Sequence, residues 1–156
     1  MKKTNAVRIL DRLKLSYRLR EFAVDESDLS AEKAAELLGV PAEQVFKTLV
    51  ARGNKNGVII ASVPGGHELE LKALARLSGD RKVEMVPLKE VQQLSGYIRG
   101  AVSPLGMKNS YPCFLDESAF CYSSIIISAG TRGVQIELSP WDLKAATAAV
   151  TGKITR

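Results

Sequence analysis

Four short segments carry side chains that could do chemistry, and the first contains Lys47. This residue is a lone cation within the otherwise apolar, β-prone range 45–50. Lysine is rarely buried without a partner. Its ammonium group could extend along the strand to solvent, or it could stand at a pocket wall and bind a phosphate, a carboxylate or a developing oxyanion. The residue types alone leave both interpretations open.

Two further segments contain glycines that could bring backbone amides close to a ligand. The range 96–106 has glycine at both ends and at Gly100, which predicts an ordered loop with unusual backbone angles. Such a loop could form an oxyanion hole or a nest for anions, or it could simply connect two elements. The range 128–133 could present a hydroxyl, an amide and the Arg132 cation to a phosphate or an ester. An ordinary hairpin turn explains that range equally well.

The fourth candidate is His67, the single histidine, which follows Pro-Gly-Gly in an expected turn. With no second histidine available, an exposed loop residue is the simpler interpretation. Cys113 and Cys121 lack a CxxC spacing, so reduced thiols and no bound metal are expected. The motifs G-x-S-x-G and H-E-x-x-H and the P-loop are absent. An enzyme with this sequence would therefore work by positioning and electrostatics around a reactive substrate.

The composition is that of an ordinary globular protein, with 156 residues, 25% of them charged and 46% hydrophobic. This length is typical of one domain, so a single domain over residues 1–156 is expected. No apolar run approaches the roughly 20 residues of a membrane span, and the charged start is unlike a signal peptide. A cytoplasmic protein is therefore expected. The net charge of +5 suits a polyanionic partner, but Lys and Arg are too dispersed to decide for nucleic acid.

Capping residues and periodicity predict the elements that hold these segments. Thr4 and Ser30 are suitable N-caps for helices that end near Leu13 and Leu38, and Asn-Gly at 56–57 favours a tight turn between antiparallel strands. Strands are expected at 17–22, 48–51, 58–63, 83–86, 112–115, 124–128 and 134–138, and further helices at 69–77, 87–94 and 139–150. Hairpins and helices follow one another irregularly, which favours a mixed sheet with helices packed around it.

In order and spacing, several segments resemble the bacterial YbaK/EbsC family of aminoacyl-tRNA editing proteins. They are Val-Phe-Lys-Thr-Leu at 45–49, 69–72, 83–85, Gly-Tyr-Ile-Arg-Gly at 96–100, 103–106, 128–133 and 136–138. The resemblance spans nearly the whole chain and is closest to the free-standing Cys-tRNA(Pro) deacylases. It implies an α/β fold of the α+β type, with a mixed, mostly antiparallel, barrel-like sheet surrounded by helices. It also implies a trans-editing hydrolase, without metal or cofactor, that removes the amino acid from the 3′ end of mischarged tRNA.

The resemblance also assigns site residues. Lys47 matches the family's essential lysine, Gly100 its functional loop glycine and Ser128 the polar residue on the facing strand, so these three are the expected catalytic residues. The expected substrate contacts are Phe22, Ala101, Ser103, Gly130, Arg132 and Gln135. This chain has Gly100-Ala101 and Ala129-Gly130 where relatives commonly have two adjacent glycines, and Gln135 replaces an acidic or small polar residue.

The nucleophile and the partners stay open at this stage. Water could attack the ester, or the substrate cysteine's own thiol could, in a lyase-type reaction. The alternatives to a Cys-tRNA(Pro) deacylase are an Ala-tRNA(Pro) deacylase and a non-catalytic adaptor that holds tRNA or a synthetase. The joint presence of Lys47, Gly100 and Ser128 favours an enzyme over the adaptor. The expected partner is mischarged tRNA, with a prolyl-tRNA synthetase as a further candidate, and no DNA or membrane partner is expected.

Overall fold

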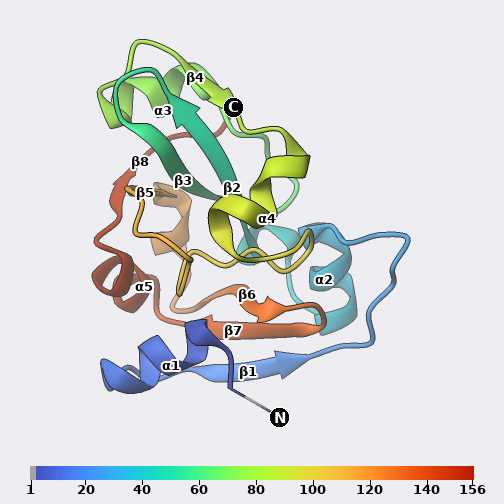
Figure 1. The fold of residues 1–156 in the computed structure, drawn as a ribbon. Helices are drawn as coiled ribbons and strands as arrows, with labels where there is room; N and C mark the ends of the chain where they lie inside the picture. The colour runs from blue at the N-terminus through green and yellow to red at the C-terminus, as the bar shows by residue number, and fades with distance from the viewer. Residues whose placement is uncertain (1–2) are drawn as a thin grey trace.

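The computed structural model describes residues 3–156, whose strands form two sheets (Figure 1). One sheet has the strand order β1-β7-β6 and the other the order β4-β2-β3-β5-β8. The strands are β1 (Arg18–Glu21), β2 (Phe46–Gly53), β3 (Gly57–Pro64), β4 (Val83–Met85), β5 (Cys113–Asp116), β6 (Ile125–Thr131), β7 (Val134–Leu138) and β8 (Val150–Gly152). The pairs β3-β5 and β5-β8 are parallel and the others are antiparallel. The prediction of a mixed, mostly antiparallel α/β architecture is therefore confirmed.

The two sheets do not close into the barrel-like shape that the resemblance implied. Within residues 3–156 they are joined by one isolated parallel bridge, between Val45 and Ile126. Beyond this bridge β2 pairs with β3 and β4, whereas β6 pairs with β7. Because the two strands take different partners, their backbones do not continue as a ladder. The opening that results is lined by side chains rather than sealed by hydrogen bonds.

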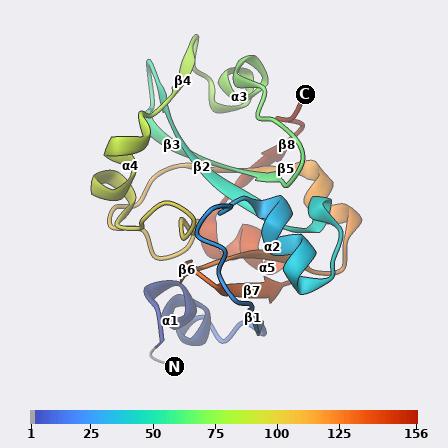
Figure 2. The ribbon, with the colours of Figure 1, turned by 90° about the vertical axis from the view of Figure 1, so that its right-hand side faces the viewer.

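Five helices form within residues 3–156, each overlapping a range that the sequence predicted as helical. They are α1 (Asn5–Arg12), α2 (Ala31–Leu38), α3 (Leu71–Ser78), α4 (Leu88–Ser95) and α5 (Pro140–Thr147), with 3₁₀ turns at Ala42–Gln44 and Glu117–Cys121. The hydroxyls of Thr4 and Ser30 accept hydrogen bonds from the first turns of α1 and α2. Figure 2 shows α1 beside the three-stranded sheet and α3 at the opposite end of the molecule. None of the helices within 3–156 has the length and apolar character needed to cross a membrane.

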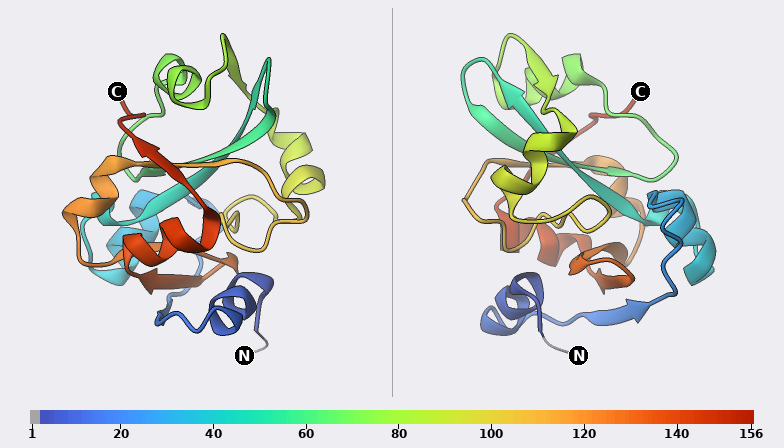
Figure 3. Two further views of the ribbon diagram at one scale, coloured as in Figure 1. Left: turned by 90° about the vertical axis from the view of Figure 1, so that its left-hand side faces the viewer. Right: turned by 45° about the vertical axis from the view of Figure 1, so that its right-hand side comes forward.

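The last helix ends earlier than the sequence suggested. It was expected to reach about Val150, but Ala148 adopts a left-handed conformation with φ of 55° and ends α5. The chain then enters β8, which runs parallel to β5 (Figure 3, left). This short strand was not predicted, because the last helix was expected to continue to about Val150, where β8 begins.

Alternation along β6 decides which of its side chains reach the opening between the sheets. Ile125 and Ile127 are fully buried in an apolar cluster with α1 and α5, whereas Ile126 packs with α2. Successive strand residues point to opposite faces, so Ser128 shares the face of Ile126. On β2, Phe46 packs in the same apolar cluster as Ile125 and Ile127. Lys47 lies on the opposite face of the strand, which it shares with Val45, and Val45 packs with Ile126.

Away from this opening, Asp80 ties the β2-β3 turn to the end of α3. Its carboxylate accepts hydrogen bonds from the amides of Lys55 and Asn56, at 2.8 and 2.9 Å, and from the Asn56 side chain and the Ser78 hydroxyl, at 3.0 and 2.6 Å. Burial disfavours the ionised carboxylate, but these donors outweigh it and hold the pKa of Asp80 well below the ordinary value. The ionised form therefore contributes to stability at neutral pH.

Asp80→Asn should lower the free energy of unfolding at pH 7 by about 1.5–3 kcal/mol, because amide nitrogen replaces a charged acceptor. A depressed folded-state pKa contributes stability above the unfolded value of 3.8 and loses it as the pH falls toward the folded value. The difference in free energy of unfolding between the wild type and Asp80→Asn should therefore be smaller when urea unfolding is measured at pH 4 and at pH 3. Glu43→Gln, at an exposed carboxylate, serves as the control. A deficit independent of pH would contradict a role for the charge.

Candidate active site

A cavity of about 520 Å³ occupies the opening between the two sheets. Five parts of the chain contribute to its lining: the segment 22–34, the start of β2 with the preceding residue, the link from β4 into α4, the loop residues Arg99, Gly100 and Val102, and the β6-β7 hairpin. Its volume falls in the range typical of small-molecule sites. The cavity therefore has room for the end of a substrate, although not for a folded nucleic acid.

The single bridge between the sheets brings Lys47 and Ser128 to the same level of this cavity. Val45 and Ile126 are bridge partners, and Lys47 and Ser128 each lie two residues further on, on the same faces of their strands. Both line the cavity. Lys47 is partly buried, and no carboxylate within residues 3–156 lies at ion-pair distance from its ammonium group. Its charge is thus available to an anionic ligand.

The Ser128 hydroxyl is oriented by the β-bulge that follows it. The register of β6 against β7 shifts between Ser128 and Thr131, and the Gly130 amide donates to Ser128 Oγ over 3.1 Å. An oxygen that accepts from the backbone keeps its own proton free to donate elsewhere. Gln135, the cross-strand partner of Ser128, lies beside it in the cavity lining. This pair can supply hydrogen-bond donors to an ester or a ribose.

Gly100 lines the cavity. It has φ of 82°, and Gly96 and Gly106 are also left-handed, which confirms the unusual loop angles. The Ala101 amide donates a hydrogen bond to the Ile98 carbonyl and closes a turn. The Gly100 amide, by contrast, has no hydrogen-bond acceptor in the part of the chain that the structure describes. A free amide in a glycine-rich loop can donate to an anion or a developing oxyanion.

The remaining predicted substrate contacts divide into two groups. Phe22, Arg132 and Gln135 line the cavity. Ala101 and Ser103 are fully buried behind the wall, and the Ser103 hydroxyl accepts from the Leu105 amide. Gly130 packs against the Tyr97 ring, where a Cβ would approach Cε1 to 2.8 Å. The three residues Ala101, Ser103 and Gly130 are not part of the cavity lining, so they can hold the wall without touching a ligand.

The histidine and the cysteines lie elsewhere. His67 is exposed in the turn after β3, as expected. Cys113 and Cys121 are free thiols, and burial raises the pKa of Cys113 to about 11, so that thiol is protonated at neutral pH. Residues 3–156 contain no cluster of three or more His, Cys, Asp or Glu side chains that could hold a metal ion.

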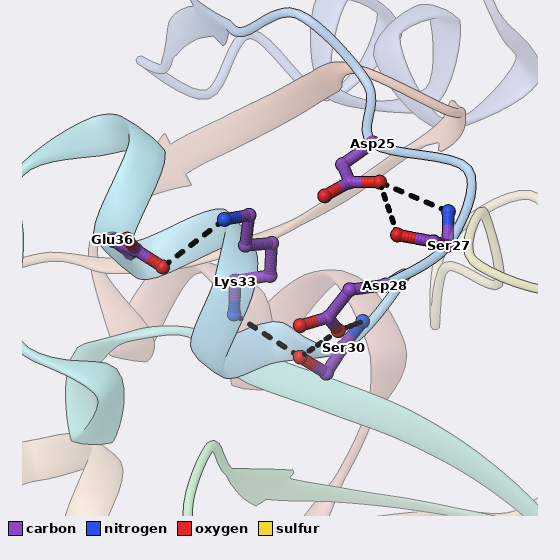
Figure 4. A network of polar contacts seen from close by, with 6 residues as sticks. All are labelled: Asp25, Ser27, Asp28, Ser30, Lys33 and Glu36. Atoms are coloured by element: carbon purple, nitrogen blue, oxygen red, sulfur yellow. Dashed lines mark hydrogen bonds and ion pairs between the residues drawn. The ribbon is translucent and has the colours of Figure 1, made fainter.

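One wall of the cavity is formed by a segment whose role the sequence analysis missed (Figure 4). Asp25 and Asp28 line the cavity, and each accepts hydrogen bonds from the amide and hydroxyl of the serine two residues later. These bonds, that from the hydroxyl first, lower the pKa of both carboxyls. Ser30 in turn caps α2. The repeated Asp-x-Ser at 25–27 and 28–30 was the available signal.

The cavity therefore combines opposite charges. Asp25 and Asp28 are ionised at neutral pH, and the lining also includes the cations Lys47, Arg99 and Arg132. A ligand with a protonated amino group near one end and a phosphate near the other would find a partner for each. A neutral hydroxyl donor at Ser128 and a free amide at Gly100 lie in the same cavity. The lining therefore offers partners of both charges to a single ligand.

Comparison with known proteins identifies the class to which this fold and site belong. The family model described as an aminoacyl-tRNA editing domain matches residues 25–146. EbsC of Enterococcus faecalis, named as a candidate Cys-tRNA(Pro)/Cys-tRNA(Cys) deacylase, is 53% identical over 138 residues, which cover 88% of this chain and 84% of EbsC. The chain belongs to the aminoacyl-tRNA editing domain family. The resemblance seen in the sequence is therefore confirmed.

Solved structures share the fold over nearly the full length. A hypothetical protein aligns with a TM-score of 0.89 at 25% identity, over 98% of this chain and all of that one. A candidate trans-editing enzyme for prolyl-tRNA synthetase aligns with a TM-score of 0.82 at 27% identity, over 100% of this chain and 99% of that one. The fold of this chain is thus shared with these two solved structures.

Proposed function

We propose that this chain acts as a single-domain, trans-editing hydrolase that deacylates mischarged tRNA, with Cys-tRNA(Pro) as its preferred substrate. The observation that carries this proposal is the presence of the Lys47 ammonium, the Gly100 amide and the Ser128 hydroxyl on one cavity. The 53% identity to EbsC supports cysteine as the amino acid. Charged tRNA circulates in the cytoplasm, so the chain is proposed to act there.

An aminoacyl ester is already activated, so the site needs no nucleophilic triad. In this proposal Lys47 binds the 3′-terminal phosphate or ribose region, Gly100 donates its N–H to the carbonyl oxygen, and Ser128 orients the ester. The donation of Gly100 strengthens as that oxygen gains negative charge in the transition state. Phe22 and Gln135 are proposed to contact the substrate from the same lining. No step draws on a metal or a cofactor.

Two nucleophiles are compatible with this arrangement. Water can add to the carbonyl carbon, after which the ester C–O bond breaks, the ribose hydroxyl recovers a proton and free amino acid leaves. Alternatively, the cysteine Sγ can bond to its own carbonyl carbon as the same C–O bond breaks. The thiol proton then passes to the ribose oxygen, and a cyclic thioester leaves. The second route needs a sulfur in the substrate.

The proposed function is tested by incubating the protein with a large excess of Cys-tRNA(Pro), Ala-tRNA(Pro) or Pro-tRNA(Pro) at one salt concentration. Repeated turnover of Cys-tRNA(Pro), with Pro-tRNA(Pro) spared, is expected. Preferential loss of alanine would move the assignment to an Ala-tRNA(Pro) deacylase. Protection of all three esters with tRNA still bound would indicate the non-catalytic adaptor.

The nucleophile is decided by comparing substrates that differ in one side-chain atom. If the thiol attacks, Ser-tRNA(Pro) and Ala-tRNA(Pro) should turn over at least about 100-fold more slowly than Cys-tRNA(Pro), because an intramolecular nucleophile has a high effective concentration. Single-turnover rates at saturating protein separate this chemical step from binding. Equal rates for cysteine and alanine would establish water as the nucleophile.

Selectivity among tRNAs is proposed to come from outside the cavity. Its volume of about 520 Å³ admits the aminoacyl end and part of the terminal nucleotide, whereas tRNA identity resides in more distant features. A prolyl-tRNA synthetase that presents its own tRNA is the candidate partner, and one solved relative is named as a candidate trans-editing enzyme for that synthetase. Adding the synthetase should then narrow the range of tRNAs that are deacylated.

A further inference from the structure

The Arg132 guanidinium joins three parts of the cavity wall. Arg132 lies in the turn between β6 and β7, and its side chain is 29% exposed. Its Nε donates to the Arg99 carbonyl over 2.9 Å, and its Nη1 lies 3.5 Å from a Glu26 carboxylate oxygen. Figure 2 shows the two segments concerned, between β1 and α2 and after α4, passing near each other. A cation expected to contact substrate is thus engaged with the protein itself.

The Arg99 carbonyl and the Gly100 amide belong to the same peptide group. A trans peptide is planar, with its C=O and N–H pointing in opposite directions, so an anchor on the carbonyl oxygen also sets the direction of the N–H. A hydrogen bond accepted by the carbonyl, here from a charged donor, also polarises the peptide and strengthens its N–H as a donor. The proposed oxyanion donor is therefore both aimed and strengthened by Arg132.

Packing around Gly100 reinforces this anchor. A Cβ on Gly100 would lie 3.1 Å from Leu29 Cβ and 3.4 Å from Arg132 Nε. Gly100 is therefore closely packed against both Leu29 and the guanidinium group. With Gly100 in the left-handed region at φ of 82°, small rotations of this peptide would turn its N–H away from the cavity.

The same contacts make Arg132 a poor phosphate clamp. Bidentate recognition of phosphate uses two adjacent N–H groups of the guanidinium. Nε is committed to the Arg99 carbonyl, and Nη1 faces Glu26, so each pair of adjacent nitrogens already includes an engaged one. Arg132 lines the cavity, but its nitrogen atoms contact other residues of the cavity wall and leave no adjacent pair for a phosphate.

We propose that Arg132 is a positioning residue, which orients and polarises the Gly100 N–H through the Arg99 carbonyl and does not bind the phosphate of the substrate. This inference rests on the proposed function, since it concerns the donor for the substrate carbonyl oxygen. Arg132 is therefore expected to contribute to kcat and not to substrate affinity.

The test compares Arg132→Met and Arg132→Lys with the wild type on Cys-tRNA(Pro). Lysine keeps the charge but places a methylene where Nε stands, so both variants should lose about 10- to 100-fold in kcat with little change in KM. The slope of log KM against log salt should also stay unchanged. If Arg132 instead contacted a phosphate, Arg132→Lys should keep near wild-type activity and Arg132→Met should have a raised KM. For Arg132→Met, the slope of log KM against log salt should also fall by about 0.7–0.9. That set of results would overturn the proposal.

Glu26→Gln is the matched control, because it removes the other partner of Arg132 and leaves the Arg99 contact in place. Its kcat should stay within about twofold of the wild type, as expected for an exposed ion pair. A loss as large as that of Arg132→Met would assign the effect to the ion pair and contradict the proposal.

An NMR spectrum of the backbone amides of the full chain tests the role of Arg132 independently of activity. In Arg132→Met the amide resonance of Gly100 should shift, because its peptide has lost a charged donor, while Glu26→Gln leaves it in place. An unchanged Gly100 resonance in Arg132→Met would overturn the positioning role even if activity fell. If the wild type hydrolysed no aminoacyl-tRNA and the resonance still shifted, the proposed function would fail and the peptide anchor would stand.

Discussion

Lys47→Ala should reduce the deacylation of Cys-tRNA(Pro) by at least about 100-fold and leave the protein as stable as before. In the proposed function this ammonium holds the 3′-terminal phosphate or ribose region, and a substrate misplaced by about 1 Å at the reacting carbonyl can react about 100-fold more slowly. The ammonium is partly buried without a carboxylate at ion-pair distance in the described chain. Its removal therefore breaks no ion pair and should not destabilise the fold.

The combination of lost activity and kept stability is the diagnostic result. Single-turnover rates and urea unfolding of Lys47→Ala should be measured beside Lys72→Ala, which removes an exposed lysine from α3. Lys72→Ala should match the wild type in both. If Lys47→Ala kept near-full activity, the ammonium would not contact the substrate and the site would be misplaced. Equal losses of rate and stability would instead indicate a structural lysine.

Local sequence signals were sufficient for most of the elements. The caps at Thr4 and Ser30 each depend on a hydroxyl and an amide three residues apart, so a few neighbouring residues determine them. The tight turn around Asn56-Gly57 and the left-handed glycines of the loop 96–106 are equally local. Such features can be predicted because none of them depends on distant parts of the chain.

The shape of the site depends on contacts that no local pattern encodes. Lys47 and Ser128 line the same cavity because of the bridge between Val45 and Ile126, and the sheets stay open because the strands then take different partners. The resemblance named candidate residues for the site but implied a barrel, which the two separate sheets correct. Whether a loop residue such as Ser103 faces a cavity or the core is likewise settled by packing.

Gly100→Ala provides the sharpest test of the proposed oxyanion donor, because the chain contains a matched control. Gly79, which ends α3, has the same φ of 82°, but a Cβ added there would have no other atom within 4 Å. Alanine in this left-handed conformation costs roughly 1–2 kcal/mol at either site. Only at Gly100 would the new Cβ press on Leu29 at 3.1 Å and on Arg132 Nε at 3.4 Å.

Both alanine variants should therefore lose stability in urea unfolding, Gly100→Ala more than Gly79→Ala because of this crowding, while only Gly100→Ala loses about 100-fold in kcat. The added methyl group would displace the Arg132 donor from the Arg99 carbonyl and turn the N–H away from the substrate, and a misplacement of about 1 Å can cost this much. Equal loss of activity in Gly79→Ala would show that stability, not the amide, limits the reaction. Full activity in Gly100→Ala would mean that the oxyanion is stabilised elsewhere, because a misdirected amide could not retain that role.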